Sequence, residues 1–238
     1  MDGSDRPGER LAHHADSWED LKASPEVVKL IRYGHKISFH KKPPLSEPKP
    51  EFATTAPLKQ LDVIRKEVKV LVKKGAMRKV PYAEAMKSKG FYSKLFCVPK
   101  PGDKWRPVIN MKPLNQFVNK KGLKMEGAQE VRNVLQPGMY GAIVDLSDAY
   151  YHVRLHKASR RYTRFILDGV IYEYLALPMG LTCSLRIFTR ITKFFMARLR
   201  RQGLIVIDVI FIIIGNNYKS GICKTQLCLQ MSLFSVTF

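Results

Sequence analysis

Two aspartates lie next to or within apolar segments, where an acidic side chain is unusual. Asp145 ends the apolar run at residues 142–144, and Asp208 interrupts the stretch GLIVIDVIFIIIGNN at residues 203–217. An ionised carboxylate among apolar side chains is costly unless it is paired or binds a metal. If two strands bring these acids together, they could hold two Mg²⁺ ions roughly 4 Å apart, which is the arrangement that supports in-line displacement at phosphorus.

Three interpretations of residues 203–217 are open: a membrane span, a buried strand with a stray acid, or a strand that carries an acid for chemistry. The apolar run from Leu204 to Ile214 has 11 residues, well short of the roughly 20 that cross a bilayer. It is rich in Ile and Val and bounded by Gly, which favours a strand over a helix. Asp208 is therefore either a site residue or a sign of sequence decay.

Chemistry on a triphosphate also needs cations near the phosphates, and one basic segment offers them. FYSKLFCVPK and KWRPVIN flank Pro101-Gly102-Asp103, a pattern that is typical of a β-hairpin. This hairpin carries Lys100, Lys104 and Arg106. We expect these side chains to lie close to the phosphates of a bound nucleotide.

Helices precede the hairpin. Ser24-Pro25 predicts the start of a helix that ends at Gly34. Residues 43–57 contain five prolines, which predicts an extended tether rather than a packed element. A longer helix is expected at about 58–74, where its lysines form either a solvated face or a nucleic-acid contact.

Downstream, strands and a helix alternate. AIVDLSDAYYHVRL (142–155) starts as a strand, and RFILDGVIYEY (164–174) predicts a second hairpin with Asp168-Gly169 in a type I′ turn. A helix then runs to about Gln202, before the last strand region at 203–217. This order predicts an α+β fold in which helices back a mostly antiparallel sheet.

The charge balance points to a polyanionic partner. The 238 residues include 41 Lys and Arg against 20 Asp and Glu, a formal net charge of +21. Nucleic acid is the commonest polyanion, and an anionic membrane surface is the weaker alternative. The four cysteines lack metal-site spacing, and no apolar secretory segment opens the chain. We therefore expect an intracellular protein, with nucleus or cytoplasm undecided.

Several motifs, in order, resemble the fingers and palm of a retroelement reverse transcriptase. They are FYSKLFCVPKPGDKWRPVINMKPLNQFV, IVDLSDAYYHVRL, YLALPMGL and GNN. The lead-in WEDL, SPEVVKLIRYG, PPL and KKGAMRKVP is similar to DIRS-type tyrosine-recombinase retrotransposons, with long-terminal-repeat elements as a neighbouring group. The resemblance covers about residues 17–218. It implies a helical lead-in and tether at 1–57, a fingers and palm domain at 58–218, and a degenerate tail at 219–238 without thumb or RNase H.

The resemblance implies which residues act on metal and phosphate. Asp145 matches the first metal-binding aspartate, the carbonyl of Leu146 would also reach the metal, and Asp208 is the remnant of the second acid. Lys100 and Arg106 match the fingers cations that grip the incoming triphosphate. The implied ion is Mg²⁺, with Mn²⁺ as an alternative, and the implied partners are dNTPs, an RNA template and a DNA primer.

The remaining implied nucleotide-binding residues surround the base and sugar. Asp148 and Ala149 match the positions whose backbone N–H groups hold the triphosphate, and Tyr150 matches the aromatic beneath the sugar. Met179 and Gly180, in LPMG, match the loop that packs against nucleotide and template.

The match breaks at the second acid. Where the family has Tyr-x-Asp-Asp, this chain has Ile207-Asp208-Val209-Ile210, without the tyrosine and without a paired acid. In one register Asp208 is the first acid and Val209 replaces the second; counted back from Gly215 without gaps, Val209 and Ile210 replace both acids and Asp208 is the preceding spacer. The Ala-Pro expected after the LPxG loop is Ser184-Leu185. These departures predict a damaged catalytic hairpin in a truncated, partly degenerate element.

Three hypotheses follow. The first is an RNA-directed DNA polymerase, and the second is a catalytically inactive retroelement remnant that only binds RNA or DNA. The third, a basic structural RNA-binding protein, has no account of the ordered motifs. An RNase H or recombinase encoded by the same element is a candidate partner, and none of the three hypotheses calls for a membrane.

Overall fold

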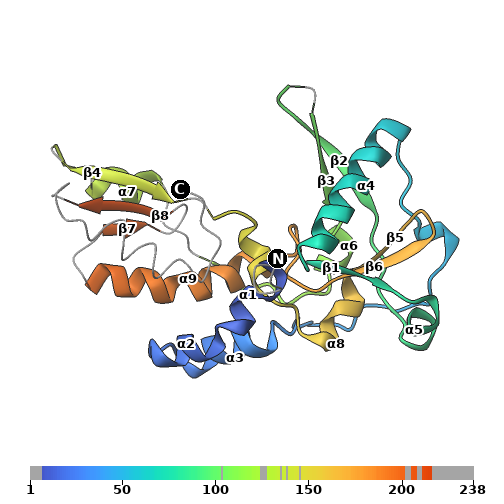
Figure 1. Ribbon diagram of the computed structural model, residues 1–238, viewed down its shortest axis with the longest axis horizontal. Helices are drawn as coiled ribbons and strands as arrows, with labels where there is room; N and C mark the ends of the chain where they lie inside the picture. The colour runs from blue at the N-terminus through green and yellow to red at the C-terminus, as the bar shows by residue number, and fades with distance from the viewer. Residues whose placement is uncertain are drawn as a thin grey trace.

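The computed structural model describes residues 7–102, 104–123, 128–134, 136–137, 139–144, 146–201, 205–207 and 211–215 (Figure 1). Figure 1 shows an elongated molecule with a small sheet at each end and the N-terminal helices beside the middle. Helices and small antiparallel sheets are both present, so the predicted α+β class is confirmed. The sheet is divided into three parts instead of being continuous.

The first part is a three-stranded antiparallel sheet in the order β1-β6-β5. Its strands are β1 (Met77–Val80), β6 (Val170–Tyr174) and β5 (Arg164–Leu167). Between β5 and β6, Asp168 and Gly169 have φ values of 49° and 73°, and a type I′ turn needs a positive φ at both of these positions. The predicted second hairpin is therefore confirmed. The short helices α5 (Tyr82–Lys87), α8 (Lys157–Arg160) and η4 (Arg161–Thr163) flank this sheet.

The second part is the basic hairpin. Its strands, β2 (Leu95–Lys100) and β3 (Lys104–Ile109), pair in antiparallel register, as the sequence predicted. Helix α4 (Leu58–Lys73) packs along both strands. It buries Ile64, Val68 and Leu71, whose spacing of four and three residues places them on one face. The short helix α6 (Lys112–Asn115) follows β3.

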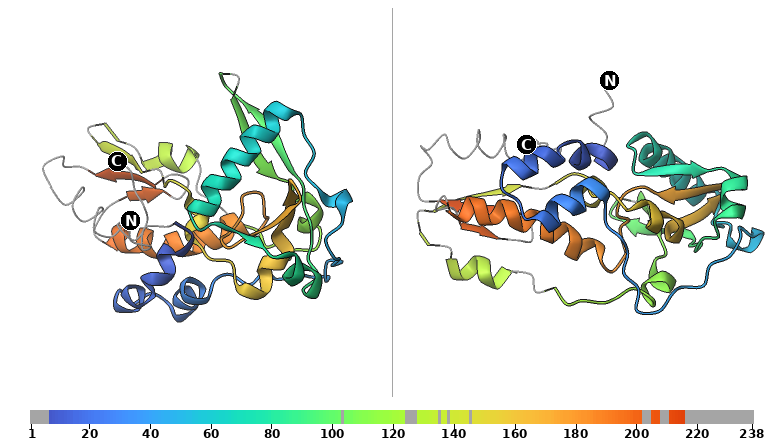
Figure 2. Two further views of the ribbon diagram at one scale, coloured as in Figure 1. Left: turned by 45° about the vertical axis from the view of Figure 1, so that its right-hand side comes forward. Right: turned by 90° about the horizontal axis from the view of Figure 1, so that it is seen from below.

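The third part lies at the opposite end and is backed by α9 (Ser184–Arg201). Its strands run in the order β4-β8-β7 and are β4 (Tyr140–Val144), β8 (Phe211–Gly215) and β7 (Ile205–Ile207). Helix α7 (Ala128–Val134) lies beside this sheet (Figure 2). The stretch expected as one strand region thus holds two antiparallel strands, which pair Ile207 with Ile212.

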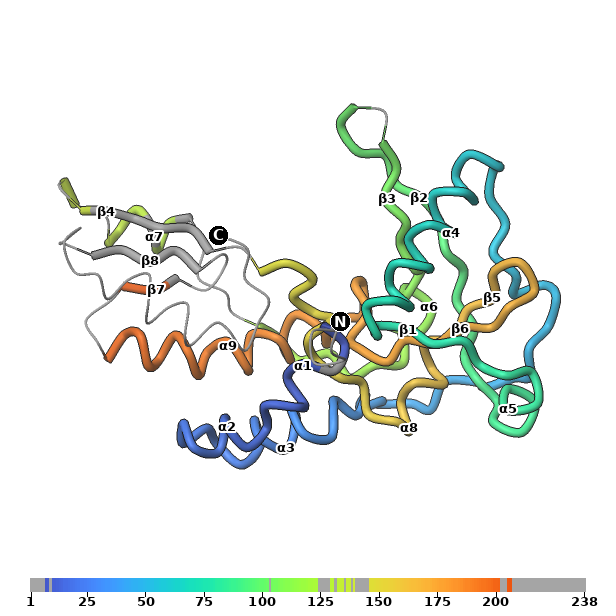
Figure 3. The backbone as a smooth tube through the Cα atoms, in the orientation of Figure 1, coloured from blue at the N-terminus to red at the C-terminus, as the bar shows by residue number. Residues whose placement is uncertain are grey.

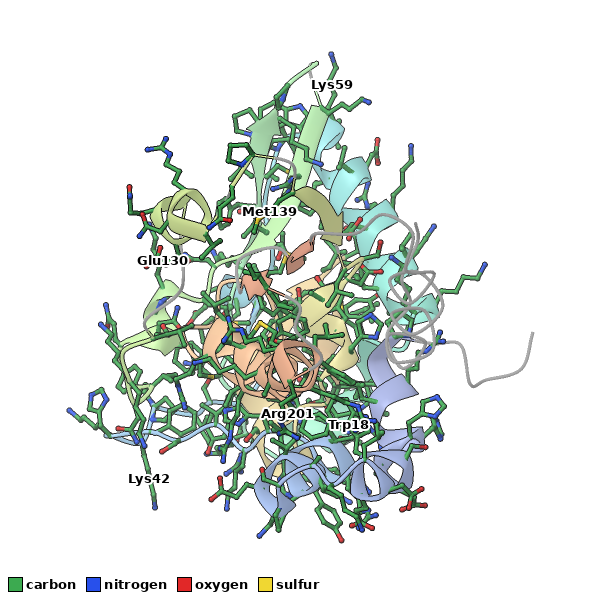
Figure 4. The ribbon with its side chains drawn as sticks, turned by 90° about the vertical axis from the view of Figure 1, so that its left-hand side faces the viewer. Trp18, Lys42, Lys59, Glu130, Met139 and Arg201 are labelled. Atoms are coloured by element: carbon green, nitrogen blue, oxygen red, sulfur yellow. The ribbon has the colours of Figure 1, made fainter. Side chains whose placement is uncertain are left out.

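The lead-in consists of α1 (Pro7–His13), α2 (Ala15–Asp20) and α3 (Pro25–Tyr33). The predicted start of α3 is confirmed, because Ser24 Oγ accepts a hydrogen bond from the N–H of Val27. The predicted end is also confirmed at Gly34. Figure 4 shows Trp18, from α2, between α9 and the lead-in helices.

The proline-rich segment at 43–57 is packed, so the expectation of an unpacked tether is wrong. Its backbone is extended apart from the 3-10 turn η2 (Pro50–Phe52), and Figure 3 traces it past β5 and β6 to the start of α4. The N–H of Thr54 donates to the carbonyl of Ile166 at 2.8 Å, and Ser46 and Gly90 exchange two backbone hydrogen bonds. These sheet-edge bonds fix the segment, because proline removes only its own N–H donor and leaves those of its neighbours.

Within the described part of the chain, no helix combines the length and the apolar character needed to cross a membrane.

Candidate nucleotide site

The basic hairpin carries its cations on one face. In the observed register Lys100 lies opposite Lys104, and Val98 lies opposite Arg106. Directly opposed residues in an antiparallel pair share a face, so Lys100 and Arg106 stand diagonally across the same face. The sequence predicted this hairpin, and the register explains how Lys100 and Arg106 can act on one ligand.

Asp148 enters the site from the start of the 3-10 turn η3 (Ala149–His152). Its backbone is left-handed, with φ 57° and ψ 28°, a conformation that aspartate tolerates better than most residues. The carbonyl of Asp148 accepts a hydrogen bond from the N–H of Tyr151 at 2.7 Å. The left-handed residue thus starts the first turn after β4 in the chain.

The hairpin and η3 meet at a cavity of about 400 Å³, called the nucleotide cavity below. Four residues that the sequence assigned to nucleotide binding line it: Lys100, Arg106, Asp148 and Met179. They come from three segments far apart in the sequence, and Met179 remains 46% exposed. The structure therefore brings together the two predicted cations, one of the two predicted backbone positions and the first residue of the predicted loop.

Lys74 holds Asp148 in place. Its Nζ lies 2.5 Å from Oδ2 of Asp148, in an ion pair whose side chains are 37% and 25% exposed. Lys74 is the residue at which α4 ends, so the pair joins that helix end to η3. The sequence had placed this lysine only on the polar side of a helix. No local pattern could have assigned it to the site, because its partner is 74 residues away.

The other predicted nucleotide residues do not line the cavity. Ala149 and Tyr150 follow Asp148 in η3, and Tyr150 packs edge-on against Phe188 with ring centroids 5.7 Å apart. Burial raises the pKa of Tyr150. Gly180 follows Met179 with φ +85°, and its carbonyl accepts a hydrogen bond from Nδ2 of Asn115 at 2.7 Å.

Sequence reasoning missed several residues of the cavity wall. Tyr151 and Tyr174 line it, with ring centroids 6.5 Å apart, and Trp105 lines it from the hairpin while 39% exposed. Burial raises the pKa of the Tyr151 hydroxyl, so this group stays protonated at neutral pH. The sequence did offer one indication that Trp105 lies in the site: it is a large aromatic residue next to Arg106 on a solvent-facing hairpin.

The two predicted catalytic acids, Asp145 and Asp208, lie outside the described residues. The strands that precede them are described. Val144, the last residue of β4, pairs with Phe211, and Ile207, the last residue of β7, pairs with Ile212. Strands β4 and β7 are therefore parallel, flank β8, and end at the same edge of the sheet.

Among the described residues, no group of three or more His, Cys, Asp or Glu side chains is placed to hold a metal ion. Leu146, whose carbonyl was a predicted ligand, is buried, with 9% of its surface exposed. The predicted donors are carboxylate and carbonyl oxygens, the set that Mg²⁺ prefers. The donor chemistry therefore fits the expected ion.

Much of the chain described above matches a known protein family. The family model described as reverse transcriptase (RNA-dependent DNA polymerase) matches residues 98–227, which is more than half of the chain. The matched span contains all of β3, η3, α9 and the β4-β8-β7 sheet. It also contains both cavity cations and the segment from β4 to η3. The chain therefore belongs to the reverse transcriptase family.

Proposed function

We propose that this chain extends a DNA primer on an RNA template, using dNTPs and two-metal-ion nucleotidyl transfer. The observation that carries the proposal is the convergence of Lys100, Arg106, Asp148 and Met179 on one cavity. Two cations on one hairpin face suit a triphosphate, because each can neutralise charge on a different phosphate.

The chain's own groups would hold the nucleotide in a defined orientation. Lys100 and Arg106 would bind the phosphates, and the backbone N–H groups of Asp148 and Ala149 would donate hydrogen bonds to them. Tyr150 would lie beneath the sugar and disfavour a ribose hydroxyl. Such positioning matters because phosphoryl transfer depends mainly on alignment and charge stabilisation.

Mg²⁺ would be held by Asp145, the carbonyl of Leu146 and Asp208. When bound, the metal activates the primer hydroxyl and neutralises charge on the departing pyrophosphate. Support comes from the shared sheet edge at which β4 and β7 end, because each proposed acid follows one of those strands directly in the sequence.

The proposed origin is a retrotransposon of the DIRS type. The proposed organisation is a lead-in at 1–57, a polymerase domain at 58–218 and a degenerate tail at 219–238. The packing of residues 43–57 against the sheet indicates that the lead-in and the polymerase domain fold as one unit.

A second candidate function is nucleic-acid binding without catalysis, by a retroelement remnant. The observation that favours it is Val209, which follows Asp208 where the family has a second acid. Losing one metal ligand can remove several kcal/mol of transition-state stabilisation. Both candidates predict salt-sensitive binding to RNA.

The test is primer extension by the purified chain on an RNA template, first with Mg²⁺ and then with Mn²⁺. The proposal predicts extension that Asp145→Asn abolishes and that Asp208→Asn abolishes or strongly reduces. Lys100→Gln should raise the KM for dNTP about tenfold, the value of one charge-assisted hydrogen bond. Lys29→Gln is the matched control, because it removes the same charge from an exposed lysine that does not line the cavity. Retained RNA binding without extension would establish the inactive remnant instead.

A further inference from the structure

A second cavity, of about 620 Å³, lies on the other face of the β1-β6-β5 sheet. The register shows this directly. Met77 pairs with Tyr174, and both line the nucleotide cavity; the next pair, Arg78 and Glu173, lines the second cavity. Successive residues in a strand point to opposite faces, so the sheet separates the two cavities. Figure 1 agrees, since α5 and α8 lie on the side of this sheet away from the β2–β3 hairpin.

The wall of this second cavity is strongly basic. Its cationic residues come from β1, α8, η4 and β5, and they are Arg78, Lys157, Arg160, Arg161 and Arg164. Among the described residues that line it, two are carboxylates, Glu84 and Glu173, so this part of the wall carries three more positive than negative charges. Such a surplus in a concave site attracts an anion.

Both lining carboxylates are already engaged at the base. Arg164 Nε lies 3.2 Å from Oε2 of Glu173, and both side chains are only 2% exposed. Arg78 contacts Glu173 with Nη2 and Oε1 2.7 Å apart, and it also pairs with Glu84. The base is thus an ion-pair network in which Arg78 and Arg164 pair with both carboxylates. Neither carboxylate pairs with Lys157 or Arg161 among the described residues.

Two other lining cations have donors without a partner among the described residues. Lys157 is exposed and forms no ion pair within the described part of the chain. Arg161 lies over the ring of Tyr162, 5.3 Å from its centroid, and its buried Nε has no hydrogen-bond acceptor among the described atoms. A buried guanidinium donor without an acceptor is costly unless a ligand supplies one.

We propose that this cavity is a phosphate-binding site on the face of the β1-β6-β5 sheet opposite the nucleotide cavity, in which Lys157 and Arg161 contact the phosphate oxygens. Guanidinium groups match phosphate geometry, and the cavity is large enough for more than one phosphate group. The phosphates can come from a single strand of nucleic acid that crosses the mouth or from a free polyphosphate. Only the choice of nucleic acid as a source rests on the proposed function.

The first arm of the test measures binding of a labelled single-stranded oligoribonucleotide over a range of KCl concentrations. EDTA is present and dNTP is omitted, so the result does not depend on catalysis. Lys157→Gln/Arg161→Gln should flatten the log–log salt dependence by roughly 0.7 for each phosphate that the protein no longer neutralises. Lys29→Gln/Lys36→Gln is the control, because it removes the same charge from exposed lysines outside both cavities.

The second arm measures thermal stabilisation by inorganic tripolyphosphate. Free polyphosphate is the source if tripolyphosphate raises the Tm of the wild type and of the Lys29→Gln/Lys36→Gln control but not that of Lys157→Gln/Arg161→Gln. In that case the salt dependence of RNA binding should be the same in both double variants. A salt-slope change without that difference in Tm identifies nucleic acid.

Equal behaviour of the two double variants in both arms would overturn the proposal. Circular dichroism of each variant establishes that the fold is intact. Primer extension that depends on Asp145, together with this negative result, would leave the proposed function standing alone. If the cavity variants differ as predicted but the chain shows no primer extension, the phosphate-binding site stands and the proposed polymerase function does not.

Discussion

Lys74 and Asp148 form an ion pair at the wall of the nucleotide cavity, with Nζ and Oδ2 2.5 Å apart. The pair connects the end of α4 to the left-handed residue that starts η3. Because Asp148 lines the cavity, the pair also neutralises a carboxylate that, in the proposed function, would otherwise face the phosphates of the nucleotide.

Lys74→Gln should therefore weaken dNTP binding roughly fivefold, which corresponds to about 1 kcal/mol for a partly exposed pair. Equilibrium titration with a fluorescent dNTP analogue measures the change. Lys73→Gln, one residue earlier and exposed, should have little effect. Adding Asp148→Asn to Lys74→Gln should restore affinity, because the unmasked carboxylate is gone. If the double variant stays as weak as Lys74→Gln, Lys74 acts on the phosphates directly and this explanation is wrong.

Local sequence patterns predicted the elements around the site well. The turn residues Asp168-Gly169 fix their hairpin because few residue pairs adopt two consecutive positive φ values. The cap at Ser24 and the stop at Gly34 likewise act within one helical turn. Such features depend on neighbours in the chain, so the sequence alone determines them.

Long-range features could not be predicted in the same way. The ion pair of Lys74 and Asp148 depends on how α4 packs against the sheet. The hydrogen bond from Thr54 to Ile166 likewise depends on a sheet edge more than 100 residues away. In residues 203–217 the nearly continuous apolar run gave no turn signal, although β7 and β8 are separate strands. Tertiary context decided each of these outcomes.

His35 should make the fold sensitive to acid. Burial, and secondarily the charge of Arg186, lower its pKa from 6.5 to about 4, and its Nε2 is buried without a hydrogen-bond partner among the described atoms. Between these values the unfolded chain binds a proton that the folded chain does not. The free energy of unfolding therefore has its full value above pH 6.5. It decreases by on the order of 3 kcal/mol as the pH falls towards 4.

Urea denaturation across that pH range measures the effect. His35→Gln removes the proton uptake, so the variant's free energy of unfolding should fall less steeply than that of the wild type. His152 is buried and its pKa is also lowered, so part of the dependence should remain. Exposed His40→Gln should follow the wild-type curve. A wild-type slope retained in His35→Gln would contradict this assignment.

Glu173→Gln should strongly destabilise the β1-β6-β5 sheet. Glu173 and Arg164 are each 2% exposed, so the substitution leaves a buried guanidinium without its counter-charge. Removing one partner of a buried ion pair costs about 3–5 kcal/mol, and the urea midpoint should fall accordingly. Glu47→Gln is a matched control, because Glu47 pairs with Lys89 at 3.6 Å on the surface. That change should cost at most about 1 kcal/mol. Similar losses in the two variants would show that burial does not govern the Glu173 pair.

Trp18 should anchor the lead-in helices to α9. Its side chain is fully buried, and its ring lies 5.6 Å from that of Phe194 and 4.6 Å from that of Phe195, measured between centroids. Trp18→Ala removes a large buried aromatic and should cost about 3–5 kcal/mol of unfolding free energy. Limited proteolysis should then cleave between the lead-in and α4 before it cleaves elsewhere.

The second tryptophan supplies the control for this experiment. Trp105 is 39% exposed on the hairpin, so Trp105→Ala should leave stability nearly unchanged while reporting the fluorescence of Trp18 alone. That emission should shift to longer wavelength in the same denaturant range in which circular dichroism is lost, because the lead-in helices share one core with α4, α9 and the β1-β6-β5 sheet. A fluorescence transition at clearly lower denaturant would mean that the lead-in unfolds independently, and the anchoring role of Trp18 would then be confined to the lead-in.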